Sequence, residues 1–136
     1  MIVIILVIVI AICNAIMNTI SHHYSTSIFT TYYYRFPARF WDPYYSWRNK
    51  YIDMDPKNGR VKWFWKINKP VQIIDAWHLF KTIMIVSMIS AIVLGNTLPS
   101  ICIFEKEWMN IGSWILILGT IWNIVFSLFY EIILRR

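Results

Sequence analysis

Three long apolar runs dominate the pattern of hydrophobic and polar positions along the chain. The first, in residues 2–22, begins with 19 residues that include no charged side chain, IVIILVIVIAICNAIMNTI. A helix of that length extends about 29 Å, close to the hydrocarbon thickness of a bilayer at about 30 Å. Similar runs lie in residues 71–96 and 108–132. The pattern therefore predicts an all-α fold, a three-span transmembrane helical bundle that forms a single membrane domain over residues 1–136.

A secretory signal is the alternative interpretation of residues 2–22. Such a signal needs a basic segment before its apolar core and a small-residue cleavage site after it. Only Met1 precedes Ile2. We therefore expect this segment to be retained as a transmembrane helix.

The basic residues predict how the three spans are oriented. Nine of the 13 Lys and Arg residues lie in residues 21–70, two are at the C-terminus, and Lys106 alone lies between the second and third spans. Cytoplasmic segments of membrane proteins are enriched in Lys and Arg. We expect a multi-pass protein of the cell membrane, with its N-terminus outside and with its C-terminus and the loop of residues 23–70 in the cytoplasm.

The amino-acid composition agrees with a membrane protein and argues against one class of protein. The chain is 58% hydrophobic and 15% charged, whereas soluble globular domains carry about 25% charged residues. This balance argues against a soluble enzyme. It leaves proteins whose solvent is largely lipid.

The loop of residues 23–70 combines aromatic and basic side chains. Residues 21–70 hold fifteen aromatic, nine basic and three acidic residues. Aromatic rings settle at the depth of the lipid headgroups, and Lys or Arg meets anionic lipid there. The same mixture can stack on single-stranded nucleic acid, but a loop joined at both ends to spans meets lipid first. We therefore expect an interfacial loop whose partners are membrane lipids with anionic headgroups, and no nucleic acid.

Polar side chains recur at helical spacing within each span, so each span has a polar stripe along one face. Polar groups seldom face lipid, and we expect all three stripes to point inward and to converge near the cytoplasmic boundary. Packing contacts between helices are the simpler interpretation of the uncharged members. The stripes are Asn14, Asn18 and His22 in the first span, Asp75, His78 and Thr82 in the second, and Thr120, Asn123, Ser127 and Glu131 in the third.

Asp75 and His78 are the strongest candidates for chemistry. They lie one turn apart, so the carboxylate can orient the imidazole and fix its tautomer, as a metal ligand or general base requires. The alternative is that Asp75 caps the helix or meets a headgroup, with His78 as its hydrogen-bond partner. We expect the pair to face the bundle interior and to approach His22 or His23.

A metal centre would have to be assembled in space, because the chain has neither a CxxC nor an HExxH motif. A divalent metal such as zinc needs three or four ligands. Lys81 is expected to reach back toward headgroups or to pair with Glu131, not to act as a catalytic amine. The candidate metal ligands are His22, His23, Asp75, His78 and Glu131.

Three blocks of sequence carry a resemblance: HHYSTSIF in residues 22–29, FWDPYYSWRNKY in residues 40–51 and DAWHLFK in residues 75–81. They resemble a family of small multi-pass membrane proteins of Bacteroidota and their phages. Members have a His-x-x-x-Ser pattern, an SWxNKY block and a TD[AG]WH block, and this chain has Ile74 in place of the family's Thr. The resemblance implies no particular activity. It draws attention to four residues as catalytic candidates, His23, Asn49, Asp75 and His78.

Two functions from different classes fit the sequence. The first is a subunit, scaffold or lipid-interaction module, a homo-oligomer or a component of a larger membrane complex, because polar stripes in so few spans need partners. The second is a membrane-embedded enzyme, with or without a metal, that acts on a lipid or amphiphile at the cytoplasmic interface. A pore is a weaker third idea, since three spans would have to oligomerise to line one.

Overall fold

The computed structural model describes residues 1–58, 74–97 and 105–135. Three helices are long and apolar enough to cross a membrane. They are α1 (Ile2–His22), α5 (Ala76–Thr97) and α6 (Glu107–Ser127), the last continued by a π-helix, η6 (Leu128–Ile133). The described residues form no strand, only an isolated bridge between Ser27 and Arg135. The chain is therefore an all-α, three-span, multi-pass membrane protein.

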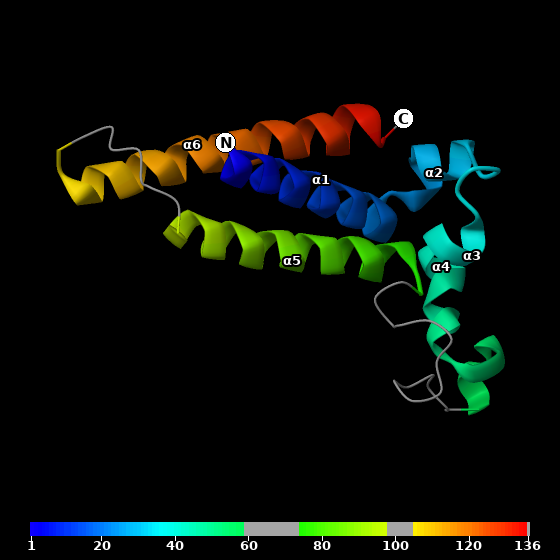
Figure 1. Cartoon of the computed structure of the whole chain (residues 1–136). Helices are drawn as coiled ribbons and strands as arrows, with labels where there is room; N and C mark the ends of the chain where they lie inside the picture. The colour runs from blue at the N-terminus through cyan, green and yellow to red at the C-terminus, as the bar shows by residue number, and fades with distance from the viewer. Residues whose placement is uncertain (59–73, 98–104, 136) are drawn as a thin grey trace.

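Helix α1 lies between the other two spans (Figure 1). It packs against α5 along one side and against α6 and η6 along the other. Six of its residues are buried, whereas α6 has none. Two of the six are Ala11 and Ala15, which are fully buried, and such small side chains let helix backbones approach closely in a membrane. The three spans therefore lie side by side in the order α6, α1, α5.

Helix α5 begins later than the apolar pattern predicted. We expected a span over residues 71–96, but Ile74 and Asp75 are not helical and α5 starts at Ala76. The physical reason is that Asp75 caps the helix, because its Oδ1 accepts a hydrogen bond of 2.8 Å from the backbone N–H of His78. Residues 71–73 lie outside the described part of the chain.

The end of the third span is fixed to the chain that follows α1. In η6 the N–H of Leu134 donates to the carbonyl of Phe129 at 2.8 Å, a bond over five residues that marks a π-turn. The carbonyl of Leu134 then accepts a bond of 3.1 Å from the N–H of Ile28. These bonds hold the C-terminal end of the third span beside the residues that leave α1.

Residues 24–58 form a set of short helices that we call the helical platform. The platform extends sideways from the end of the bundle where α1 ends and α5 begins (Figure 1). Two of its helices have side-chain caps, since Ser27 accepts from the N–H of Phe29 at 3.3 Å and Asp42 from that of Tyr44 at 2.8 Å. Its elements are η1 (Tyr24–Thr26), α2 (Ile28–Thr31), α3 (Ala38–Trp41), α4 (Pro43–Ser46), η2 (Trp47–Lys50), η3 (Ile52–Met54) and η4 (Pro56–Asn58).

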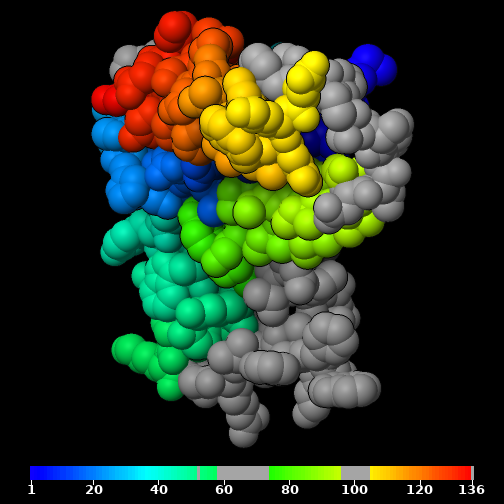
Figure 2. Space-filling model, turned by 90° about the vertical axis from the view of Figure 1, so that its left-hand side faces the viewer, coloured from blue at the N-terminus to red at the C-terminus, as the bar shows by residue number. Residues whose placement is uncertain are grey.

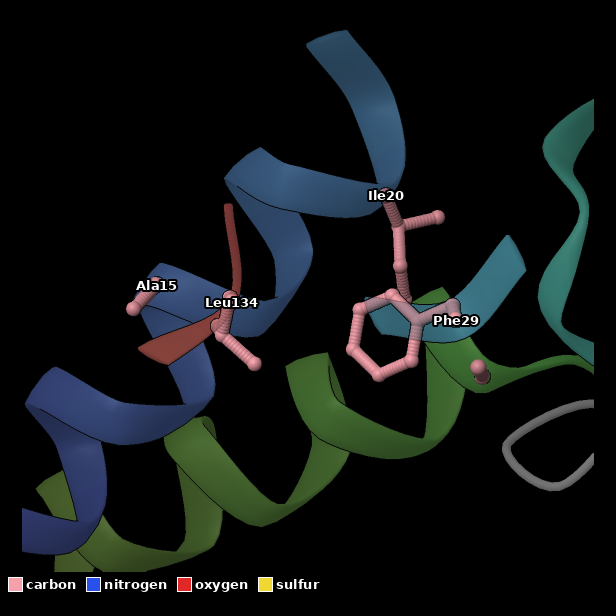
Figure 3. Packing of buried hydrophobic residues seen from close by; sticks show 5 residues of the cluster. Ala15, Ile20, Phe29 and Leu134 are labelled. Atoms are coloured by element: carbon pink, nitrogen blue, oxygen red, sulfur yellow. The ribbon is translucent and has the colours of Figure 1, made fainter. Parts of the chain in front are cut away.

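A small core joins the platform to the spans. Its buried members are Ala15, Ile20, Phe29, Ala76 and Leu134, and the side chain of Ile20 points toward the ring of Phe29 (Figure 3). Seen from the opposite end of the bundle, α6 lies above α5, and the later part of the platform, drawn in teal and green, lies below α5 (Figure 2). The core is therefore concentrated at one end of the bundle, where all three spans meet the platform.

Aromatic contacts extend this core into the platform. The ring of Phe29 stacks on Trp41 with centroids 4.6 Å apart, and Phe36 meets both rings edge-on at 5.2 and 4.9 Å. Trp41 also lies 5.8 Å from the ring of Phe80 in α5. The platform is thus packed against the second span as well as the first.

The three polar stripes do not all face inward. In α1, Asn18 Nδ2 bonds to the Asn14 carbonyl at 3.1 Å and to its Oδ1 at 3.2 Å. His22, the last residue of that stripe, is exposed. The prediction was wrong for the third span, because Thr120, Asn123, Ser127 and Glu131 are all exposed on α6 and η6.

Candidate functional site

The candidate site is built on the first turn of α5. Asp75 is buried, with 3% of its surface exposed, and uses both carboxylate oxygens. Oδ1 accepts from the backbone N–H of His78 at 2.8 Å, and Oδ2 lies 2.7 Å from Nδ1 of the same residue. Asp75 is therefore both the cap of α5 and the hydrogen-bond partner of His78, as the spacing of the two residues predicted.

This geometry decides which nitrogen of His78 can act on a ligand. In a neutral imidazole, one ring nitrogen donates and the other accepts. Since Nδ1 faces the carboxylate, the proton of the neutral ring belongs on Nδ1, and Nε2 presents its lone pair. The side chain of His78 is 40% exposed. A buried carboxylate that orients a half-exposed imidazole can serve proton transfer or ligand binding.

A cavity of about 220 Å³ lies beside the pair. It forms where the end of α1, helix α4 with the start of η2, and the start of α5 come together. Most of its lining is apolar, and a small number of polar groups in an apolar wall is usual for a ligand site. The lining residues are Ile20, Ser21, Pro43, Ser46, Trp47, Asp75, Trp77 and His78.

Asn49 lies outside the cavity, but its side chain connects the elements that surround it. Its Nδ2 donates to the carbonyl of Arg39 at 2.7 Å and to the carbonyl of Ile74 at 2.9 Å. Ile74 directly precedes Asp75, so the amide fixes η2 to the start of α5. Asn49, which was predicted as a catalytic candidate, binds backbone with both of its donor hydrogens and does not line the cavity.

The histidines at the end of α1 do not complete the site. The cavity takes Ile20 and Ser21 from that helix, whereas His22 is exposed. The ring of His23 turns toward the third span and meets Tyr130 edge-on at 5.6 Å. The physical reason is that α1 ends at His22, and the chain turns away at His23, whose φ is −134°.

Glu131 also lies away from the cavity. It pairs with Arg135 at 2.9 Å on the last turn of the third span, and Lys81 lies over the ring of Trp77 at 4.7 Å from its centroid, not beside Glu131. Within residues 1–58, 74–97 and 105–135, no three His, Cys, Asp or Glu side chains form a group that could hold a metal ion. Of the five predicted ligands, the structure therefore brings together only Asp75 and His78, while His22, His23 and Glu131 lie apart from them.

Sequence reasoning missed six residues of the cavity, Ile20 and Pro43 as well as Ser21, Ser46, Trp47 and Trp77. Three of them lie inside the SWRNKY and DAWH blocks, so the blocks themselves were the available signal. Ser46 is 5% exposed, and its place in the wall depends on the cap that Asp42 gives α4. Ser21 carried no signal, because nothing in the pattern marks which side of the end of α1 faces α5.

The outer surface of the platform is rich in exposed aromatic rings. Tyr33, Tyr34, Tyr44 and Tyr45 have between 50% and 74% of their surface exposed. Basic side chains lie over neighbouring rings: the Arg35 guanidinium over Tyr34 at 5.7 Å, that of Arg48 over Tyr44 at 5.8 Å and over Trp47 at 5.7 Å, and the Lys50 ammonium over Trp47 at 5.9 Å and over Tyr51 at 5.1 Å. This surface can make aromatic and cationic contacts together.

The surroundings of Tyr24 disfavour the ionised form of its side chain. Tyr24 begins η1, where the chain leaves α1. Burial, helped by the negative charge of Asp42, raises the pKa of Tyr24 above its ordinary value. The ring therefore stays neutral over the physiological range.

Comparison with known proteins adds no further assignment to this geometry. The resemblance carried by the three sequence blocks stays a prediction. No family model, no curated protein and no solved structure matches the chain.

Proposed function

We propose that the protein is a lipid-interaction module: a three-span anchor whose platform binds the anionic surface of the cytoplasmic leaflet and serves as a scaffold there. One observation carries the proposal. Exposed Tyr and Trp rings and the basic groups over them occupy the platform, at the end of the bundle where all three spans meet it.

Two physical effects favour this function. Tyr and Trp prefer the depth of the headgroups, where one end of the ring is apolar and the other is wet. A basic group near an anionic leaflet contributes about 1 kcal/mol. Because Arg48 and Lys50 lie over rings, the cations and the anchoring aromatics share one depth. The sideways extension of the platform suits a layer that follows the membrane surface.

The choice of leaflet follows from the distribution of charge. The platform carries five basic residues, Arg35, Arg39, Arg48, Lys50 and Lys57, whereas the opposite end has Lys106 between Glu105 and Glu107. The positive-inside rule then favours the cytoplasm for the platform and the C-terminus. Anionic lipids are concentrated in that leaflet. The orientation favoured by the charges therefore places the platform beside the lipids that we propose it binds.

A lipid-exchange experiment tests the proposal. The full chain is placed in nanodiscs that contain phosphatidylcholine and phosphatidylglycerol, and native mass spectrometry measures which lipids stay bound after mild release. We expect several-fold enrichment of phosphatidylglycerol, and loss of most of it in Arg48→Gln/Lys50→Gln. Lys106→Gln is the control for removing a cation at the other end. Equal retention of the two lipids by the wild-type protein would contradict the proposal.

A second function is favoured by a separate observation, the orientation of His78 at the cavity. Asp75 is buried and bonded to Nδ1, which leaves Nε2 for proton transfer to an amphiphile that enters from the interface. The test is incubation of the protein with a membrane lipid extract, followed by mass spectrometry for a product that His78→Gln does not form. The enzyme hypothesis fails if wild type and variant leave the extract unchanged.

A further inference from the structure

One face of α6 is covered by no other part of the described chain. Its exposed positions Gly112, Leu116, Thr120, Asn123 and Ser127, which we call the outer face of α6, follow one another at spacings of four, four, three and four. Such spacing places them on one side of a helix. Helix α1 packs against α6, and these residues lie away from that contact. A lipid-exposed face is expected to be apolar, yet four of these five residues are small or polar.

Asn123 is the residue that lipid cannot satisfy. Its Nδ2 donates one hydrogen bond of 2.9 Å to the carbonyl of Gly119. A carboxamide has two donor hydrogens and an acceptor oxygen, and among the described residues this bond is its only hydrogen bond. The contrast with α1 is direct, because Asn18 there bonds to both oxygens of Asn14. In hydrocarbon, an unmet polar group costs free energy that a partner helix recovers.

Two glycines, one on this face and one next to it, supply a second observation. Gly112 and Gly119 are seven residues apart, and a Cβ added at either would meet nothing within 4 Å. The described fold therefore has no steric need for glycine at these positions, while glycine within a helix is unfavourable relative to alanine. In membranes, small residues on one face allow the backbone of another helix to approach closely.

We propose that the outer face of α6 is the contact between two copies of this chain. Copies inserted in the same orientation lie parallel, so a two-fold axis brings identical residues together at one depth. An asparagine suits such a contact, because it both donates and accepts and can pair with itself. The charges agree as well, since Glu131 and Arg135 lie at the same end of each copy and can exchange partners across the axis.

The arrangement of the spans is compatible with this dimer. Helix α6 lies on one side of α1 and α5 on the other, and the platform from α4 onward extends on the α5 side (Figures 1 and 2). Two copies joined through the outer face of α6 would therefore keep α4 and the elements after it away from the contact. The inference does not depend on the proposed lipid binding.

The test measures the association of the full chain in lipid. Protein labelled with donor and acceptor dyes is reconstituted in phosphatidylcholine vesicles over a series of protein-to-lipid ratios, and energy transfer gives the monomer–dimer equilibrium. We expect transfer that saturates as a dimer. Asn123→Leu and Gly119→Leu should each raise the dissociation constant at least tenfold.

Gly95→Leu is the matched control, because Gly95 on α5 is also exposed with nothing within 4 Å of an added Cβ. It should leave the dissociation constant within twofold of that of the wild type. Circular dichroism checks that each variant keeps its helix content. A wild-type protein that stays monomeric at every ratio would overturn the proposal and favour a different membrane subunit on this face. An equal loss of association in Gly95→Leu would overturn it too.

Discussion

The side-chain amide of Asn49 donates a hydrogen bond of 2.9 Å to the backbone carbonyl of Ile74, 25 residues further along the chain. The same nitrogen donates to the carbonyl of Arg39 at 2.7 Å. One side chain therefore joins two parts of the platform to the residue that precedes the cap of α5. The position of Asp75 and His78 relative to α4 depends on this junction.

Replacing Asn49 should loosen the start of α5 without unfolding the spans. Asn49→Ala removes both bonds and leaves two carbonyls without their partner, which costs about 1 to 3 kcal/mol of stability when such groups are buried. We expect faster hydrogen exchange at the amides of His78 and Leu79, whose acceptors belong to Asp75. Lys50→Ala, one residue along, should leave these rates unchanged. Equal rates in Asn49→Ala and wild type would contradict the role of the amide.

Substitutions at Asp75 and His78 should differ in severity. Asp75→Ala removes the helix cap together with the partner of His78, and losing a cap costs about 0.5 to 2 kcal/mol. His78→Phe keeps the backbone N–H that the Asp75 Oδ1 accepts from and loses only the bond of 2.7 Å to Nδ1. We therefore expect a larger fall in thermal stability for Asp75→Ala, measured by circular dichroism in detergent. The reverse order would show that the cap contributes little.

Phe29 should be essential for docking of the platform. It is 2% exposed and touches the rings of Phe36 and Trp41, and truncating a buried Phe costs about 3 to 5 kcal/mol. We expect Phe29→Ala to lose the near-ultraviolet dichroism of packed aromatics while keeping its helix content. Tyr33→Ala, at a side chain 74% exposed, is the control and should keep both signals.

Tyr24 predicts a loss of stability in alkali. Burial and Asp42 raise its pKa in the folded state, whereas an unfolded tyrosine titrates at about 10. Stability from the neutral ring is fully present below that unfolded value, and it falls as pH rises toward and through the higher folded value. The midpoint of unfolding should therefore drop more between pH 9 and pH 11 in wild type than in Tyr24→Phe. Tyr33→Phe should follow wild type.

Topology can be tested by cysteine labelling. In a variant without Cys13 and Cys102, Lys57→Cys and Lys106→Cys are exposed to an impermeant maleimide in intact cells. We expect label at position 106 and none at position 57, because the positive-inside rule places the platform in the cytoplasm. The opposite pattern would reverse the orientation and move the proposed lipid contact to the outer leaflet.

The spans were predictable because their physical cause is local. The bounds of α1 follow from a run that is apolar over one bilayer thickness, and the structure has that helix as Ile2–His22. The Asp75–His78 pair was also predictable, since a spacing of three residues fixes neighbours on a helix. Only the start of α5 differed, because Asp75 ended the apolar pattern by capping the helix instead of lying within it.

What escaped prediction depended on contacts far apart in the chain. Asn49 and Ile74 lie 25 residues apart, and no pattern of spacing joins them. His23 was assigned to the site because of its depth, but the turn after α1 directs its ring to Tyr130. The stripe containing Asn123 was expected inside because polar groups seldom face lipid. Its exposure is the reason to consider a second copy.

The central position of α1 has a consequence for how the molecule is made. Helix α1 is synthesised before α5 and α6, so it has to be stable in the bilayer before they can pack against it. It can be stable there because Asn18 bonds back to Asn14 and Thr19 to the carbonyl of Ala15, at 2.9 Å for the latter. Helix α1 thus forms some of the hydrogen bonds of its polar side chains within itself before α5 and α6 pack against it.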